Sequence, residues 1–200
     1  MSRTTTRLID DLRDPANADA WSGFDARYRP VLTGFARALG FGADDAAEIA
    51  QQALAEFSIA YRAGRYERGR GRLSSWLIGI ARHLALEQRR RRGARHAGGD
   101  SVLLEVPACS TDDAHLTRVW AKEREAAILA EAVAVLRDSP RLEEHTMRAF
   151  ELFVVRGMPA ATVAAECGID IDSVYTIKNR LLKRLREIVR ELTTAYDDGE

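Results

Sequence analysis

The chain has 200 residues, of which 46% are hydrophobic and 30% are charged, and this composition fits one large or two small folded domains rather than a disordered protein. Its formal net charge of zero argues against a protein that coats nucleic acid by charge alone. No apolar run approaches the roughly 20 residues that cross a bilayer, and the first residues lack a signal-peptide core, so we expect a cytoplasmic protein without a membrane partner.

Helical spacing of apolar residues dominates the first third of the chain. A short amphipathic segment, Thr4–Asp14, precedes a helix expected over Trp21–Leu39, where aromatic and aliphatic residues recur at three- and four-residue intervals. Asp44 or Asp45 can cap the next helix, which is expected to run to about Tyr61.

This third predicted helix opens with acidic and amide side chains. Carboxylates at a helix amino end are stabilising on their own account, because they face the positive end of the helix dipole. They can equally bind a basic protein surface, since a chain with separate acidic and basic segments can offer each to a different partner. The candidate residues for such a protein interface are Asp44, Asp45, Glu48, Gln51 and Gln52.

A strongly basic segment follows. Between Tyr61 and Ala97 stand eleven arginines and only two glutamates, first in a loop over 63–71 and then on a helix expected over Leu73–Arg92. Aromatic faces stack on unpaired bases while arginines neutralise the backbone, so this segment is a candidate surface for single-stranded DNA. Trp76 is equally well explained as a core residue, with the arginines as a solvated face. The candidate residues are Tyr66, Arg70, Arg72, Trp76, Arg82, His83, Arg89 and Arg90.

The middle of the chain, Gly93–Asp113, is rich in turn-forming residues and weakly periodic, which indicates a connector. Two further helices are expected over Val119–Leu136 and Glu143–Val155, and no segment has the pattern of a strand. The sequence therefore predicts an all-α protein with two small helical domains, 1–95 and 115–200, joined by a flexible linker over 96–114.

The second domain ends in a predicted helix-turn-helix. Its first helix is Ala160–Cys167, its turn contains Gly168, and its second helix runs from Ile171 to about Leu192. Any helical hairpin has an apolar stripe like the one on this second helix, but the glycine turn and the short first helix favour DNA binding. The start of a recognition helix meets base edges in the major groove. The candidate residues are Asp172, Ser173, Tyr175, Thr176, Lys178, Asn179 and Lys183.

Signals for catalysis are lacking in the sequence. Its four histidines are scattered, and it contains no HExxH, P-loop or GxSxG motif. Its two cysteines, Cys109 and Cys167, form no CxxC pair, so neither a disulfide framework nor a zinc site is favoured. We therefore expect a protein that is not an enzyme, has no catalytic residue and needs no metal or cofactor.

In their order along the chain, these features resemble the extracytoplasmic-function group of bacterial RNA polymerase sigma factors. The matching segments are Asp45–Gln52, Leu73–His83 and Val154–Val174. The resemblance implies that the first domain binds the clamp helices of core RNA polymerase through the acidic candidate residues. It implies that the loop over 63–73 and the helix over 76–92 melt the minus-ten element of promoter DNA and hold an unstacked base. It further implies that the second domain reads the minus-thirty-five element with residues 172–183 and meets the polymerase flap.

Departures from the family pattern point to regulation and to altered specificity. Ala47 and Gln52 stand where the family has acids, which weakens the expected contact with polymerase. Some related sigma factors regain that charge through a serine/threonine kinase, and Ser58 is the only serine or threonine on this helix. An anti-sigma factor is the other regulatory partner to consider. His83 stands where asparagine is usual, Ile177 where many relatives have arginine, and Tyr175 where they have a small or basic residue, so the family's base preferences do not carry over to this chain.

An alternative from another class is a free-standing helix-turn-helix regulator that binds operator DNA as a dimer. Such a regulator needs a ligand pocket or a dimer face in its first domain, where this chain has an arginine-rich helix beside an acidic one. For the sigma factor, we expect the free protein to bind duplex promoter DNA poorly.

Overall fold

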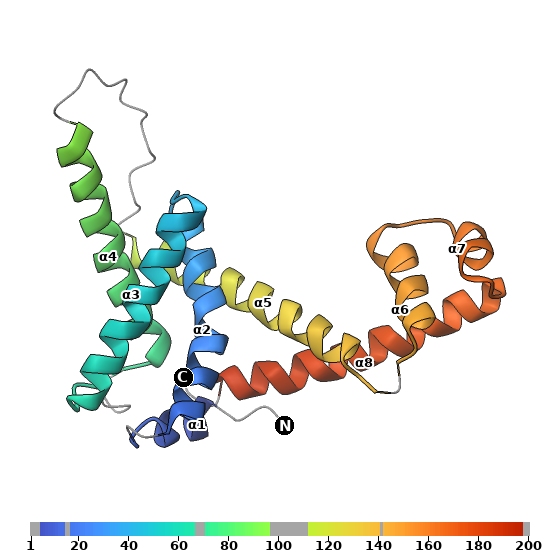
Figure 1. The fold of residues 1–200 in the computed structure, drawn as a ribbon, viewed down its shortest axis with the longest axis horizontal. Coiled ribbons are helices and arrows are strands. Elements are labelled where there is room, and N and C mark those ends of the chain that lie inside the picture. Colours follow the sequence, from blue (N-terminus) through green and yellow to red (C-terminus); the bar gives the residue numbers. More distant parts are fainter. Residues whose placement is uncertain (1–4, 15–16, 67–70, 97–111, 141, 198–200) are drawn as a thin grey trace. The chain divides into compact units, whose positions relative to one another are not determined.

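The computed structural model describes residues 5–14, 17–66, 71–96, 112–140 and 142–197 (Figure 1). Within these ranges every regular element is helical, which confirms the predicted all-α class. None of the described helices is both long and apolar enough to cross a membrane. The elements are α1 (Thr5–Asp11), α2 (Ala18–Ala38), α3 (Ala43–Arg62), α4 (Leu73–His96), α5 (Asp113–Arg137), α6 (Glu144–Phe150), a π-helical turn (Glu151–Val155), α7 (Ala160–Cys167) and α8 (Ile171–Asp197).

The described residues form two compact units. The first contains α1 to α4, the α5 residues up to Ala127 and the α8 residues from Ala195 onward; the second contains the residues from Ile128 to Thr194. The sequence placed the division at a linker over 96–114, most of which lies outside the described residues. The first half of α5, which the sequence assigned to the second domain, thus belongs to the first unit.

Packing of α5 on α2 explains this assignment. The side chains of Leu116 and Trp120 are 1% and 3% exposed, and the Trp120 ring meets the edge of Phe35 with 5.9 Å between centroids. Burying two such side chains contributes about 1.5–3 kcal/mol each. Gly34 has no side chain at the point where Glu123 crosses α2, which permits this close approach.

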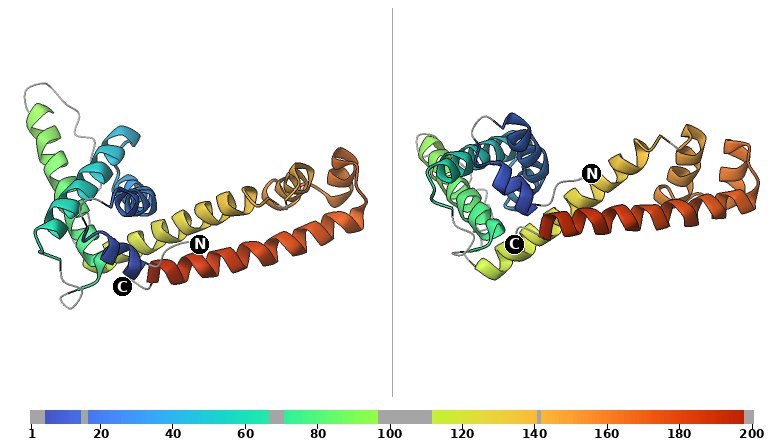
Figure 2. Two further views of the ribbon diagram at one scale, coloured as in Figure 1. Left: turned by 60° about the horizontal axis from the view of Figure 1, so that its bottom comes forward. Right: turned by 90° about the horizontal axis from the view of Figure 1, so that it is seen from below.

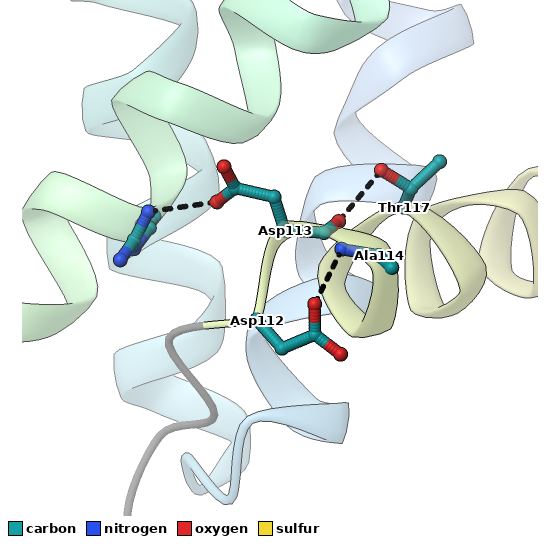
Figure 3. A network of polar contacts seen from close by, with 5 residues as sticks. Asp112, Asp113, Ala114 and Thr117 are labelled. Carbon is teal, nitrogen blue, oxygen red and sulfur yellow. Dashed lines mark hydrogen bonds and ion pairs between the residues drawn. The ribbon is translucent and has the colours of Figure 1, made fainter.

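The start of α5 is fixed by two neighbouring aspartates (Figure 3). Asp112 accepts a hydrogen bond from the Ala114 backbone N–H at 3.0 Å, and the Thr117 hydroxyl donates to the Asp113 carbonyl at 2.8 Å. The Asp113 carboxylate forms an ion pair with Arg82 of α4 at 3.1 Å. The helix therefore begins six residues before the predicted start at Val119, because a capping residue and a neighbouring helix both favour the earlier start.

The core of the first unit is a cluster of aromatic rings. Helices α2, α3 and α4 pack on one another, and α1 packs on α2 (Figure 1 and Figure 2). Phe57 of α3 is fully buried and stacks on Phe24 of α2 with 4.6 Å between ring centroids. The last described turn of α8 closes one side of this unit: the Tyr196 hydroxyl donates to the Arg27 carbonyl at 3.1 Å, and Arg27 donates to the Ala195 carbonyl at 3.3 Å.

The second unit is built around the short helix α7 and the first part of α8. Gly168 ends α7 with a φ of 65°, a left-handed conformation that glycine adopts without steric cost. The Ile169 N–H then donates to the Ala164 carbonyl at 3.0 Å, and α8 begins at Ile171. Val163 of α7 and Val174 of α8 are both buried. The observed bounds of α7 and the start of α8 are those expected from the sequence.

Candidate functional site

The aromatic part of the basic segment is built into the core. Trp76 of α4 stacks on Tyr66 with ring centroids 5.0 Å apart and planes 8° apart, and it meets the edge of Phe57 at 5.5 Å. Both Tyr66 and Trp76 are half-buried. The sequence left Trp76 open as either a base-stacking residue or a core residue. These contacts favour a core residue that is still partly exposed.

A cavity of about 500 Å³ lies beside Tyr66. Tyr61, Arg62, Gly64 and Tyr66 form one wall, and Ile9, Asp10, Leu12 and Arg13 of the first segment of the chain form the other. A hydrogen bond of 2.5 Å from the Tyr61 hydroxyl to the Ile9 carbonyl holds the two walls together. Sequence reasoning missed the contribution of this first segment, because nothing local in Thr5–Asp14 signals where it packs.

Four of the eight candidate residues of the basic segment lie on one stripe, which begins just before α4 and continues along it. Trp76, His83 and Arg90 are seven residues apart, and Arg72 precedes Trp76 by four, a spacing that brings side chains to one face of a helix. Arg72, His83 and Arg90 are exposed. Arg70 lies outside the described residues.

Two other candidate arginines make contacts inside the first unit. Arg82 forms the ion pair with Asp113 described above. Arg89 donates to the Leu39 carbonyl at 2.5 Å, and its guanidinium lies 5.4 Å from the centre of the Phe41 ring. Arg82 thus joins α4 to the start of α5 and Arg89 satisfies the carbonyl at the end of α2, so the two arginines also have structural roles.

The acidic candidate residues of α3 divide into two groups. Asp44, Glu48 and Gln51 are exposed at helical spacing, and Gln52 donates from Nε2 to Glu48 at 3.0 Å. We call Asp44, Glu48, Gln51 and Gln52 the acidic face. Asp45 instead contacts α4, where it pairs with Gln88 and Arg92.

The candidate residues on α8 present one exposed face at its start. Asp172, Tyr175, Thr176, Asn179 and Lys183 are exposed at three- and four-residue steps. We call these five residues the α8 face. Lys178 lies with its ammonium 5.7 Å from the Phe153 ring centre, and Tyr175 meets the edge of the same ring at 5.4 Å. Phe153 belongs to the π-helical turn, and no local pattern singled it out.

Ser173 serves the helix start rather than the exposed face. Its backbone N–H and its hydroxyl both donate to the Asp170 carboxylate at 2.7 Å, which makes Asp170 the amino-terminal cap of α8. The hydrogen bond from the Ser173 hydroxyl, followed by that from its N–H, holds the pKa of Asp170 below its ordinary value.

We expect Asp170→Ala to loosen the first turn of α8, raising amide hydrogen exchange at residues 172–174 several-fold, because two donors lose their acceptor. A carboxyl whose pKa falls on folding stabilises the native state above its ordinary pKa, and this stabilisation is lost as the pH falls through the lower native value. Asp170→Asn should retain most of the protection, since an amide oxygen also accepts these bonds. Equal loss in both variants would show that cap geometry is not the cause.

Part of the chain matches a known protein family. Residues 24–95, which run from within α2 through α4, match the family model of sigma-70 region 2. No curated protein matches the chain. The matched range contains the acidic face and the α4 stripe. From within α2 to near the end of α4, the chain is thus similar to sigma-70 region 2, a domain of the sigma factors that act with RNA polymerase in transcription.

Proposed function

We propose that this protein is a sigma factor of the extracytoplasmic-function group, which binds core RNA polymerase in the cytoplasm and directs initiation at specific promoters. One observation carries the proposal: the carboxylates of the acidic face on α3 and the basic residues of the α4 stripe are both exposed within the range that matches sigma-70 region 2. In this proposal the first unit contains the region 2-like part, and the second unit, Ile128 to Thr194, contains the region 4-like part.

The acidic face is the proposed contact with the polymerase clamp helices. Asp44 and Glu48 put two carboxylates one helical turn apart, and both are exposed. Complementary charge speeds association and fixes the register of a partner more than it adds affinity. The amide side chains of Gln51 and Gln52 extend the face by a turn and can donate or accept hydrogen bonds.

The α4 stripe and the cavity beside Tyr66 are the proposed minus-ten surface. Stacking of an unpaired base on an aromatic ring is worth about 1–3 kcal/mol, so captured bases can drive strand opening without nucleotide hydrolysis. A cavity of about 500 Å³ lies within the size range of small-molecule sites. Arg72, just before α4, and Arg90, about four turns beyond Trp76, are both exposed and can meet backbone phosphates along the stripe.

The α8 face is the proposed reader of the minus-thirty-five element. Asn179 and Lys183 can hydrogen-bond purine edges in the major groove, and Thr176 can contact a thymine methyl group. The exposed residues lie within the first four turns of α8, the part of a recognition helix that enters the groove. In this proposal, the second domain also meets the polymerase flap.

Run-off transcription tests the proposal. Core RNA polymerase with the wild-type protein should produce discrete transcripts from fragmented genomic DNA. Thr176→Ala/Asn179→Ala should reduce them about tenfold or more, since each lost base contact costs about 1–3 kcal/mol. Arg190→Ala, on the same helix but three turns beyond Asn179, is the matched control. Tight, specific binding of the free protein to duplex DNA, with no effect on polymerase, would instead favour the dimeric regulator.

Control by a serine/threonine kinase or an anti-sigma factor would supplement this function. Ser58 is half-buried on α3, beside Ile59, whose side chain is 66% exposed. A phosphate there would add up to two negative charges to the helix that carries the acidic face. If the unmodified protein binds core polymerase at nanomolar strength, phosphorylation is not needed; if only Ser58→Asp binds, the kinase is favoured.

A further inference from the structure

Asp45 differs from the other acidic candidate residues in what its carboxylate contacts. Its side chain is only 21% exposed, and its two oxygens have different partners on α4. Gln88 donates from Nε2 to Oδ1 at 3.1 Å, and the Arg92 guanidinium pairs with Oδ2. Both carboxylate oxygens of Asp45 are therefore engaged by side chains of α4.

The end of α4 is held at the same corner by two further contacts. Arg89 donates to the Leu39 carbonyl at 2.5 Å. The guanidinium groups of Arg89 and Arg92 lie 5.4 and 5.7 Å from the centre of the buried Phe41 ring, within the range of a cation–π interaction. We call Leu39, Phe41 and Asp45, with Gln88, Arg89 and Arg92, the α4 anchor.

The anchor compensates for a repulsion that the sequence builds into this helix. Arg89 to Arg92 are four consecutive cations in the last part of α4, and like charges on neighbouring turns destabilise a helix. Arg89 and Arg92, three residues apart, share one face and point to the corner between α2 and α3. Arg90 is exposed beside them on the stripe that contains His83.

We propose that Asp45 is a positioning residue: it anchors α4 so that His83 and Arg90 are presented to DNA, and it is not a principal contact of polymerase. The proposal rests on the proposed function for its DNA readout. If Asp45 has this role, the residues proposed to bind polymerase are those of the acidic face alone. The proposal also predicts that the ion pair between Asp45 of α3 and Arg92 of α4 links the position of the polymerase-binding helix α3 to DNA binding by α4.

A charge exchange tests the anchor in the full-length free protein. Asp45→Arg and Arg92→Asp should each raise amide hydrogen exchange over residues 84–93 about tenfold, the size of effect expected when a native contact worth one or two kcal/mol is lost. The double variant Asp45→Arg/Arg92→Asp should restore protection to within about threefold of the wild type, because the pair is re-formed with reversed charges. Glu87→Gln, which breaks the 2.6 Å pair with Arg91 within α4, is the control and should change exchange less. Single variants that exchange like the control, or a double variant without rescue, would overturn the anchor.

The same variants in run-off transcription test the positioning role. Asp45→Arg and Arg92→Asp should each lower the transcript yield, and the double variant should restore it. In a separate binding measurement, Asp45→Asn should weaken binding to core polymerase less than Glu48→Gln does. The positioning role of Asp45 would be overturned if variants with a loosened α4 gave an unchanged transcript yield. It would also be overturned if the double variant did not bind core polymerase. A wild-type protein that binds no core polymerase would overturn the proposed function and the role of Asp45 together, whereas hydrogen exchange would report on the anchor independently.

Discussion

Phe57→Ala is expected to lower the free energy of unfolding of the first unit by about 3–5 kcal/mol, the usual cost of removing a fully buried aromatic ring. The Phe57 side chain is 0% exposed and lies at the centre of the aromatic cluster. It stacks on Phe24 at 4.6 Å and on Tyr61 at 5.7 Å, and it meets Trp76 at 5.5 Å. Such pairs add about 0.5–1.5 kcal/mol each beyond their buried area.

Urea unfolding followed by tryptophan fluorescence measures this change. Trp21, Trp76 and Trp120 are the three tryptophans of the chain, and all lie in the first unit, so the signal reports on that unit alone. Ile59→Ala on the same helix is the control: its side chain is 66% exposed, and the change should stay within about 0.5 kcal/mol. If both variants unfold at the same urea concentration, the ring cluster does not hold the unit together.

Glu48→Lys is expected to weaken binding to core RNA polymerase more than tenfold. Glu48 lies in the middle of the acidic face, and a lysine there would set like charges against a basic partner surface, which costs several kcal/mol. Because Gln52 already donates to Glu48 within α3, the carboxylate is held in place before any partner arrives. Titration of labelled protein with purified core polymerase gives the dissociation constant directly.

Glu125→Lys provides the matched control, since it makes the same charge change on an exposed position of α5. It should alter binding only slightly, through the net charge, and the small effect should disappear as added salt screens it. An equal loss of affinity in both variants would mean that overall charge, and not the acidic face, determines binding.

The sequence predicted the helices well where periodicity is strong. The expected ranges for α3 and α4 differ from the observed ones by only a few residues, because their apolar residues recur at helical spacing over many turns. The start of α5 was missed, since it depends on the Asp112 cap and on burial of Leu116 against another helix. Neither feature changes the local periodicity on which the prediction was based.

The exposed faces of the candidate site were also predictable, whereas the internal partners were not. Asp44 and Glu48, or Thr176 and Asn179, share a face by spacing alone. The attachment of Asp45 to α4 requires two helices to meet at a particular angle, and so does the contact of Phe153 with α8. Spacing alone therefore cannot tell an exposed carboxylate such as Asp44 from a structural one such as Asp45. That distinction requires the tertiary contacts.

Gly34 has a consequence for how this protein can change during evolution. A side chain at position 34 would meet the end of the Glu123 side chain where α5 passes α2, so a larger residue there requires Glu123 to turn away or to be shorter. We expect relatives with alanine or serine at position 34 to have a short residue at position 123 more often than relatives with glycine do. Such paired variation between α2 and α5 would be visible in an alignment of relatives and would mark the α2–α5 seam as an inherited contact.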